Sequence, residues 1–311
     1  MLNPKILVGV DGSNASLNAL KWAAELAVKV GGSLNLVCAY TYPAFAASSL
    51  DGGFAAIDDL AISQGAKAVL SNAAELLNDY DLDATTQVVT GDAAGALIDL
   101  STDYDLAVVG TRGRGGFTER LLGTVSSALP AHAHCPTVVI PFHEQPKSAT
   151  DPNDNSDIYS ANLKRIVVGF DGSKASLGAL EYAGKIAAIW GSELHVLHAA
   201  NLGFATGAFV WVPTALDRQE TLRELEKELD ETLAVYENSG GYPITRKIVL
   251  EGTGAELLKD LSQTADLIVV GSRGRGGFKG LLLGSTSQAI LHHSQCPVLV
   301  LNDKTEAELK D

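Results

Sequence analysis

Cysteine is scarce in this sequence of 311 residues. The three cysteines, Cys38, Cys135 and Cys296, are too few and odd in number for a disulfide framework, and they suit a reducing compartment, where cysteine acts as a small hydrophobic residue. Long apolar runs are also lacking, since none approaches the ~18 residues of a membrane span, and the N-terminus carries no charged leader followed by an apolar segment. We therefore expect a soluble, cytoplasmic protein with no membrane partner.

Basic residues are fewer than acidic residues. The chain has 23 Lys and Arg against 37 Asp and Glu, a net charge of -14 at pH 7. This charge repels nucleic acid, so we expect no nucleic-acid partner. The few arginines are concentrated in two glycine-rich stretches, 110–124 and 271–285, where Arg112, Arg114, Arg273 and Arg275 can act locally on a small anion.

The sequence contains a long internal repeat. The run from Lys5 repeats from Arg165, a shift of 160 residues, and the run from Asp105 repeats from Asp266, a shift of 161. A repeat of this length is a duplicated domain of the usual size rather than a solenoid unit. We predict one domain over 1–142, a polar linker over 143–162 and a second domain over 163–303.

Short apolar, β-branched runs alternate with helix-length stretches in each half. In the first half, we predict strands over 6–10, 34–39, 86–89, 105–109 and 137–140, all buried on both faces. Residues 13–30 have helical apolar spacing, with Ser13 as N-cap and Gly31 past the end. This alternation predicts an α/β fold with a parallel sheet covered by helices on both faces. In the second half, the helix from Asp217 has a packed apolar side made of Leu222, Leu225, Leu229 and Leu233.

Each glycine-rich stretch begins where a predicted strand ends. Gly110 and Gly113 let the backbone approach a ligand with no Cβ in the way. The N–H groups of residues 123–126, at the start of the next helix, can form an anion site to which their hydroxyls add donors. Phosphate is the natural occupant. A P-loop, a dinucleotide-binding G-x-G-x-x-G after the first strand and the partner motifs of a kinase are all absent from the sequence.

With these residues in place, each half resembles the universal stress protein domain. The nucleotide-binding branch of that family carries G-x2-G-x9-G-[ST] after its fourth strand and an Asp just after its first. The first half matches with Gly110, Gly113, Gly123, Thr124 and Asp11, and the second with Gly271, Gly274, Gly284, Ser285 and Asp171. The complete spacing, present twice, is far more specific than a lone G-x-x-G.

The resemblance implies two tandem, doubly wound, Rossmann-like domains, each with five parallel strands in the order 3-2-1-4-5. It also implies that each domain binds ATP, with Mg or Mn carried by the nucleotide. The implied sites comprise Gly9, Asp11, Ala39, Gly110, Gly113, Gly123, Thr124, Val125 and Ser126 in the first half, and Gly169, Asp171, Ala199, Gly271, Gly274, Gly284, Ser285, Thr286 and Ser287 in the second. By the same resemblance, Ala39 and Ala199 lie near the adenine, the two aspartates fix the nucleoside, and the edge strands pair the halves with each other or with another chain as a homodimer.

Simpler roles remain open for several of these residues. Asp11 can initiate a turn that caps the following helix, alone or together with ligand binding. The arginines of the glycine-rich stretches can be exposed and idle. His132–Cys135 and His292–Cys296 match no zinc-site spacing, and we expect these histidines to end helices, where the dipole favours them.

The two copies depart from each other at Pro130, which corresponds to Leu291 in the second half. A proline inside a helix costs roughly 3 kcal/mol unless the helix bends. We therefore expect the two sites to differ in shape or affinity, although the sequence does not say which is tighter.

Three functions follow from these patterns. The first is a stress-response regulator that binds ATP in both domains without fast turnover, because no catalytic base or nucleophile stands out, and that contacts an unidentified protein partner. The second is a slow ATPase or autophosphorylating enzyme whose acceptors are drawn from Thr124, Ser126, Ser285 and Ser287. The third is a dimerisation module with vestigial sites. AMP or a cyclic nucleotide in place of ATP also stays open.

Overall fold

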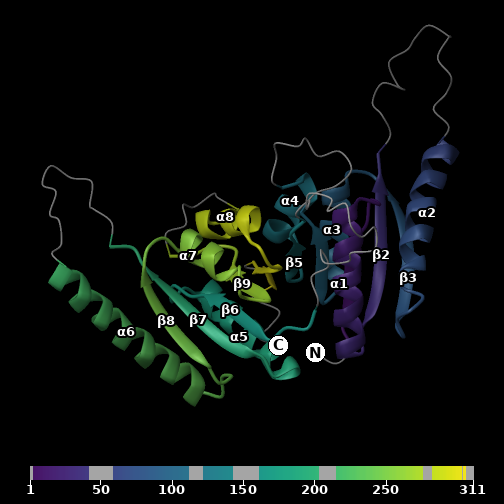
Figure 1. The fold of residues 1–311 in the computed structure, drawn as a ribbon. Helices are drawn as coiled ribbons and strands as arrows, with labels where there is room; N and C mark the ends of the chain where they lie inside the picture. The colour runs from purple at the N-terminus through teal and green to yellow at the C-terminus, as the bar shows by residue number, and fades with distance from the viewer. Residues whose placement is uncertain are drawn as a thin grey trace, which may run out of the picture. The chain divides into compact units, whose positions relative to one another are not determined.

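The computed structural model describes residues 3–41, 59–111, 122–142, 161–202, 215–275, 282–302 and 304–305. They belong to two compact units, Met1–Ala161 and Asn162–Asp311. Each unit alternates strands with helices (Figure 1). This division agrees with the predicted duplication, while residues 143–160 of the predicted linker lie outside the described residues.

The same elements recur in both units in the same order. The first unit contains β1 (Lys5–Gly9), α1 (Asn14–Val30), β2 (Ser33–Tyr40), α2 (Asp59–Glu75), β3 (Asp83–Thr90), α3 (Ala93–Leu100), a 3₁₀ helix (Ser101–Asp103), β4 (Leu106–Gly110), α4 (Thr124–His132) and β5 (Thr137–Ile140). The second contains β6 (Arg165–Gly169), α5 (Lys174–Trp190), β7 (Glu193–Ala200), α6 (Ala215–Asn238), β8 (Arg246–Glu251), α7 (Gly254–Leu261), β9 (Leu267–Gly271), α8 (Ser285–His293) and β10 (Val298–Leu301).

Each unit builds a parallel sheet around its first strand. The order is β3-β2-β1-β4-β5 in the first unit and β8-β7-β6-β9-β10 in the second, which confirms the predicted order 3-2-1-4-5. The register is the same in both: Val8 pairs with Leu36 and Val108, and Val168 pairs with Val196 and Val269. The chain reverses its direction across the sheet after the third strand. Right-handed crossovers therefore place the first two helices of each unit on one face and the last two on the other.

The core of each unit lies on the two central strands. Ile6, Leu7 and Val8 of β1 are fully buried, as the apolar pattern predicted. The prediction of burial on both faces is wrong for β3, whose first five residues are exposed. β3 is an edge strand with one strand neighbour, β2, and its helix contacts come from α2. Because it lies at the edge of the sheet, β3 buries less apolar surface than its β-branched sequence suggested.

Helix ends follow the predicted caps. Ser13 is the N-cap of α1, where its side chain accepts from the N–H of Ser16, and Gly31 ends the helix with φ of 68°. Ser173 and Gly191 repeat this arrangement around α5. Glycine suits the left-handed C-cap because it has no Cβ. These caps fix where α1 and α5 begin, which is at the carboxyl end of each sheet.

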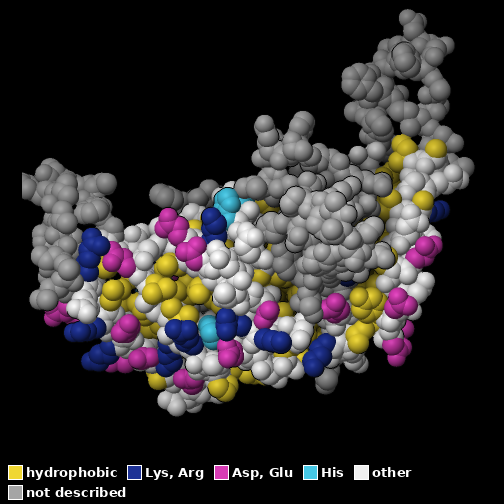
Figure 2. All heavy atoms as spheres, in the orientation of Figure 1, with side chains coloured by type: hydrophobic (Ala, Val, Ile, Leu, Met, Phe, Trp, Pro, Cys, Tyr) yellow, Lys and Arg dark blue, Asp and Glu magenta, His cyan; other side chains and the backbone are white. Residues whose placement is uncertain are grey.

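The predicted packed side of α6 is confirmed. Leu229 and Leu233 are buried and Leu222 and Leu225 are half-buried, and α6 runs along β8 (Figure 1). Acidic and basic side chains are interspersed over the described part of the face in Figure 2. Of the described helices, none has both the length and the apolar character that crossing a membrane requires.

In each unit, a glycine at the end of the fourth strand lets the first helix pack closely against that strand. A Cβ at Gly110 would lie 2.5 Å from the carbonyl oxygen of Ala15 in α1, and a Cβ at Gly271 would lie 2.6 Å from the Cβ of Ala175 in α5. Packing inside the unit already requires the missing Cβ at Gly110, so this glycine is not by itself evidence that a ligand approaches the backbone, as the sequence predicted. The same holds for Gly271.

Replacing this glycine should destabilise the fold. Gly110→Ala is expected to lower the free energy of unfolding by about 1–3 kcal/mol, because backbone atoms of α1 would have to move. Gly65→Ala is the matched control, since Gly65 lies in α2 and a Cβ there meets nothing within 4 Å. Urea denaturation followed by circular dichroism measures both, and equal stability of the two variants would contradict the packing argument.

Candidate functional site

The turn after β6 presents a carboxylate at the carboxyl end of the sheet. Asp171 accepts a hydrogen bond at Oδ1 from the N–H of Ser173 (3.0 Å). It accepts another at Oδ2 from the N–H of Arg275 (2.8 Å), which lies in the glycine-rich stretch. Gly172, with φ of 75°, completes the turn. Asp171 therefore joins the start of α5 to the segment that follows β9.

These hydrogen bonds keep Asp171 ionised. Burial of this half-buried side chain raises the pKa, but the hydrogen bonds from Ser173, Arg275 and Ser176 favour the charged form and leave the pKa below the ordinary value of an aspartate. Asp171 is thus a hydrogen-bond acceptor at neutral pH rather than a proton donor.

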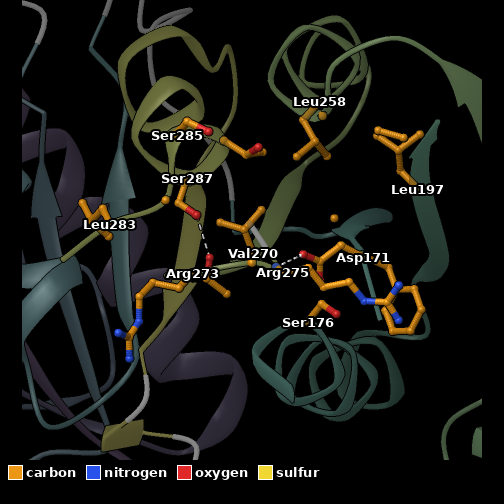
Figure 3. A pocket seen from close by; sticks show the side chains of 18 residues that line it. Asp171, Ser176, Leu197, Leu258, Val270, Arg273, Arg275, Leu283, Ser285 and Ser287 are labelled. Carbon is orange, nitrogen blue, oxygen red and sulfur yellow. Dashed lines mark hydrogen bonds between the residues drawn. The ribbon is translucent and has the colours of Figure 1, made fainter. Parts of the chain in front are cut away.

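The segment after β9 contains a second glycine that the fold requires. A Cβ at Gly274 would collide with Oδ2 of Asp171, so a larger residue there would displace the carboxylate from its present position. The Arg275 side chain lies next to Asp171, while that of Arg273 points the other way (Figure 3). A Cβ at Gly172 would lie 2.5 Å from the Arg275 guanidinium. The Arg275 side chain therefore packs on the turn, although Arg275 as a whole is exposed to solvent.

Helix α8 starts at the opposite side of the same segment. Its first-turn N–H groups, on Ser285, Thr286 and Ser287, have no carbonyl partner within the helix, and the helix dipole adds positive potential there. The N–H of Gly284 is not part of this set, because it donates to the carbonyl of Ser272 (2.7 Å). The N–H of Gly123 likewise donates to the carbonyl of Thr111 (2.8 Å). The anion site predicted over four N–H groups is therefore reduced to three.

Two predicted hydroxyl donors are used by the fold. The Ser287 Oγ donates to the carbonyl of Gly271 (2.6 Å), and the Ser126 Oγ donates to the carbonyl of Thr111 (2.8 Å). Both serines are buried. The prediction that these hydroxyls add donors for phosphate or act as phosphoryl acceptors is therefore wrong. Thr124 and Ser285, which are exposed, keep that role open.

A cavity of about 450 Å³ brings these features together in the second unit (Figure 3). It lies beyond the carboxyl ends of β6, β7 and β9, between the N-termini of α7 and α8. All nine residues predicted for this half line it, namely Gly169, Asp171, Ala199, Gly271, Gly274, Gly284, Ser285, Thr286 and Ser287. The sequence reasoning missed Phe170, Ser176, Leu197, Gly254, Leu258, Val270 and Leu283, which also line it. Leu197 was open to prediction, because it lies two residues before Ala199 and so shares its face of the strand.

The described part of the first unit repeats this arrangement. Asp11 Oδ1 accepts from the N–H (3.0 Å) and the hydroxyl (2.6 Å) of Ser13, so the turn role considered for Asp11 is confirmed. Gly9 is the last residue of β1 and Ala39 is the last but one of β2, as Gly169 and Ala199 are in β6 and β7. Thr124–Ser126 are the first three residues of α4. Gly113, Arg112 and Arg114 lie outside the described residues.

The histidines that invited a metal interpretation lie at helix ends, as predicted. His132 is the last residue of α4, and His292 and His293 are the last two of α8. Within the described residues, no three His, Cys, Asp or Glu side chains are grouped so as to hold a metal ion. Pro130 lies inside α4, which nevertheless has the same nine-residue length as α8.

Known proteins share both the sequence and the fold. The sequence matches the model of the universal stress protein family over residues 3–141 and again over 162–302. It is 33% identical over 316 residues to universal stress protein Rv1996 of Mycobacterium tuberculosis, covering 96% of this chain and 95% of the relative. It is also 33% identical over 312 residues to Rv2623 of the same organism, covering 96% of each. A solved universal stress protein from Archaeoglobus fulgidus superposes with a TM-score of 0.66 at 23% identity, over 96% of this chain and 98% of that one, and so shares the fold.

The hydrogen bonds at Asp171 should make a contribution to stability that depends on pH. Because the pKa is lowered in the folded state, the contribution is complete above the pKa of the unfolded chain and is lost as the pH falls through the lower pKa of the folded state. Asp171→Asn is expected to lower the free energy of unfolding by about 1 kcal/mol at pH 7 and pH 5, with a smaller difference at pH 3. Urea denaturation at the three pH values measures this.

The control is Asp260→Asn, which changes an exposed aspartate of α7 and should leave stability unchanged at all three pH values. A deficit in Asp171→Asn that stays constant down to pH 3 would show that the charge of Asp171 plays no part.

Proposed function

The chain belongs to the universal stress protein family, and on that premise we propose that it binds one ATP in each tandem domain and acts in the cytoplasm as a nucleotide-dependent regulator rather than as a fast enzyme. One observation carries the proposal: the nine residues predicted for the second half line a single cavity. Its volume of about 450 Å³ falls within the range of small-molecule sites, roughly 300–1,000 Å³.

The chemistry of the cavity suits a nucleoside phosphate. The first-turn N–H groups of Ser285, Thr286 and Ser287 supply donors and positive potential for the phosphates. The ionised carboxylate of Asp171 supplies acceptors for the hydroxyls of a ribose. The apolar side chains of Leu197, Leu258 and Val270 supply a surface for the base.

The same cavity is poorly equipped for fast hydrolysis. A general base works best when its pKa lies near the operating pH. Among the described residues that line the cavity, Asp171 is the one carboxylate, and its pKa is lowered rather than raised. Binding with slow or no turnover is the consequence. This supports the regulator over the slow ATPase.

Nucleotide retained from the cell tests the proposal. Freshly purified protein is denatured, and the released small molecules are identified and counted by mass spectrometry. We expect about two ATP per chain in the wild type, about one in either Gly123→Glu or Gly284→Glu, and none in the double variant. A Cβ at Gly284 makes only ordinary contact, 3.4 Å from the carbonyl oxygen of Ser272, so the glutamate can extend into the cavity and place a negative charge where the phosphates bind.

The control is Gly65→Glu, which adds the same charge on α2 where a Cβ meets nothing within 4 Å. It should retain wild-type nucleotide. ATP added to nucleotide-free protein should raise the melting temperature by mass action. If the wild type releases no nucleotide and ATP gives no stabilisation, the proposal fails and a dimerisation module replaces it.

Turnover is a separate measurement. We expect release of inorganic phosphate from ATP by the wild type to be no faster than by the variant with both Asp11→Asn and Asp171→Asn. Steady phosphate release that is abolished in this double variant would instead establish the slow ATPase.

A further inference from the structure

The fold accounts for most of the glycines around the cavity of the second unit. A Cβ at Gly271 would meet Ala175, a Cβ at Gly274 would meet Asp171, and a Cβ at Gly169 would lie 3.0 Å from Leu258. A Cβ at any of these three glycines would therefore make neighbouring atoms of the unit shift. They say nothing about a ligand.

Gly254 is different, because the fold does not require it. It is the first residue of α7, where glycine is a poorer helix former than alanine. Its φ lies outside the left-handed region, and a Cβ there would lie 3.4 Å from the Thr286 side chain and 3.8 Å from the Ala199 Cβ, which are ordinary contacts. An alanine would fit, yet Gly254 lines the cavity and leaves that space open.

The first unit has a methyl group at each of the two equivalent positions. α3 begins at Ala93, after the N-cap Asp92, as α7 begins at Gly254 after the N-cap Thr253. The second residue of the next helix is Val125 in α4 and Thr286 in α8. The wall of the second cavity therefore has more room and one more hydroxyl than its counterpart.

The Gly254 and Thr286 pair lies where two helix N-termini meet. The side chain of Thr286, in the first turn of α8, lies closest to the point where a Cβ of Gly254 would be. At the start of α7, the N–H of Glu256 donates to the Oγ1 of the N-cap Thr253 (3.2 Å), whereas the N–H groups of Gly254 and Ala255 have no carbonyl partner in their own helix. Figure 3 shows both helices beside the cavity, with Leu258 and Ser285 on them. Without a Cβ at residue 254, a ligand held by α8 can also approach the N-terminus of α7.

We propose that Gly254 and Thr286 make the second site the tighter of the two ATP sites. This inference rests on the proposed function and deepens it. Gly254 admits the nucleotide to a second helix N-terminus, and the Thr286 hydroxyl offers it a hydrogen bond that Val125 cannot. The two sites of one chain then fill over different ranges of ATP concentration.

Calorimetric titration of the full-length chain with MgATP tests the proposal. Gly123→Glu leaves the second site available, and Gly284→Glu leaves the first. We expect the second site to bind about 10-fold more tightly, the effect of about one methyl group in a binding pocket. Gly254→Ala with Thr286→Val, made in the Gly123→Glu chain, should remove that advantage. Ala93→Gly with Val125→Thr, made in the Gly284→Glu chain, should tighten the first site.

The control is Gly65→Ala, which should leave both dissociation constants unchanged. Circular dichroism and an unchanged melting temperature verify that the exchanged variants fold, since an alanine at residue 254 makes only ordinary contacts. Equal affinities at the two sites, or exchanges that leave them unchanged, would overturn the inference while the proposed function stands. Absence of binding in the wild type as well would overturn both.

Discussion

The packing of a strand-end glycine against the first helix is the contact on which the site depends. Gly271 ends β9 and lies against Ala175 in the first turn of α5, as Gly110 lies against Ala15 in α1. This approach brings the turn that precedes the helix to the segment that follows the strand. Asp171 can then accept the N–H of Arg275, and the cavity opens between that turn and the start of α8. A side chain on the glycine would separate the parts that form the cavity.

Much of the fold was predictable because its signals are local. Apolar β-branched runs, the caps Ser13 and Gly31 and the duplication gave the strands, the helix bounds and the two units. The strand order came from the family resemblance. Exposure of β3 was missed because an edge strand and a central strand can have the same residue types, and position in the sheet depends on pairing between distant segments.

The residues that form the site could be predicted from the sequence, but their individual roles could not. All nine residues assigned to the second half line its cavity, whereas the reason for several of them was wrong. A glycine has the same appearance in a sequence whether it admits a ligand or a helix, so the role of Gly110 depended on knowing that Ala15 lies opposite. The carbonyl that binds the Ser126 hydroxyl is likewise defined only by the fold. Gly254 belongs to no recognised spacing and was overlooked.

The ends of each glycine-rich stretch are tied to each other. The N–H of Gly123 donates to the carbonyl of Thr111, and the N–H of Gly284 donates to that of Ser272, so each loop leaves and rejoins the unit at a single closed point. Residues inserted in or deleted from a loop closed in this way would not strain the sheet, and the entropy of closing it varies only slowly with its length. The sheet therefore does not set the length of these loops.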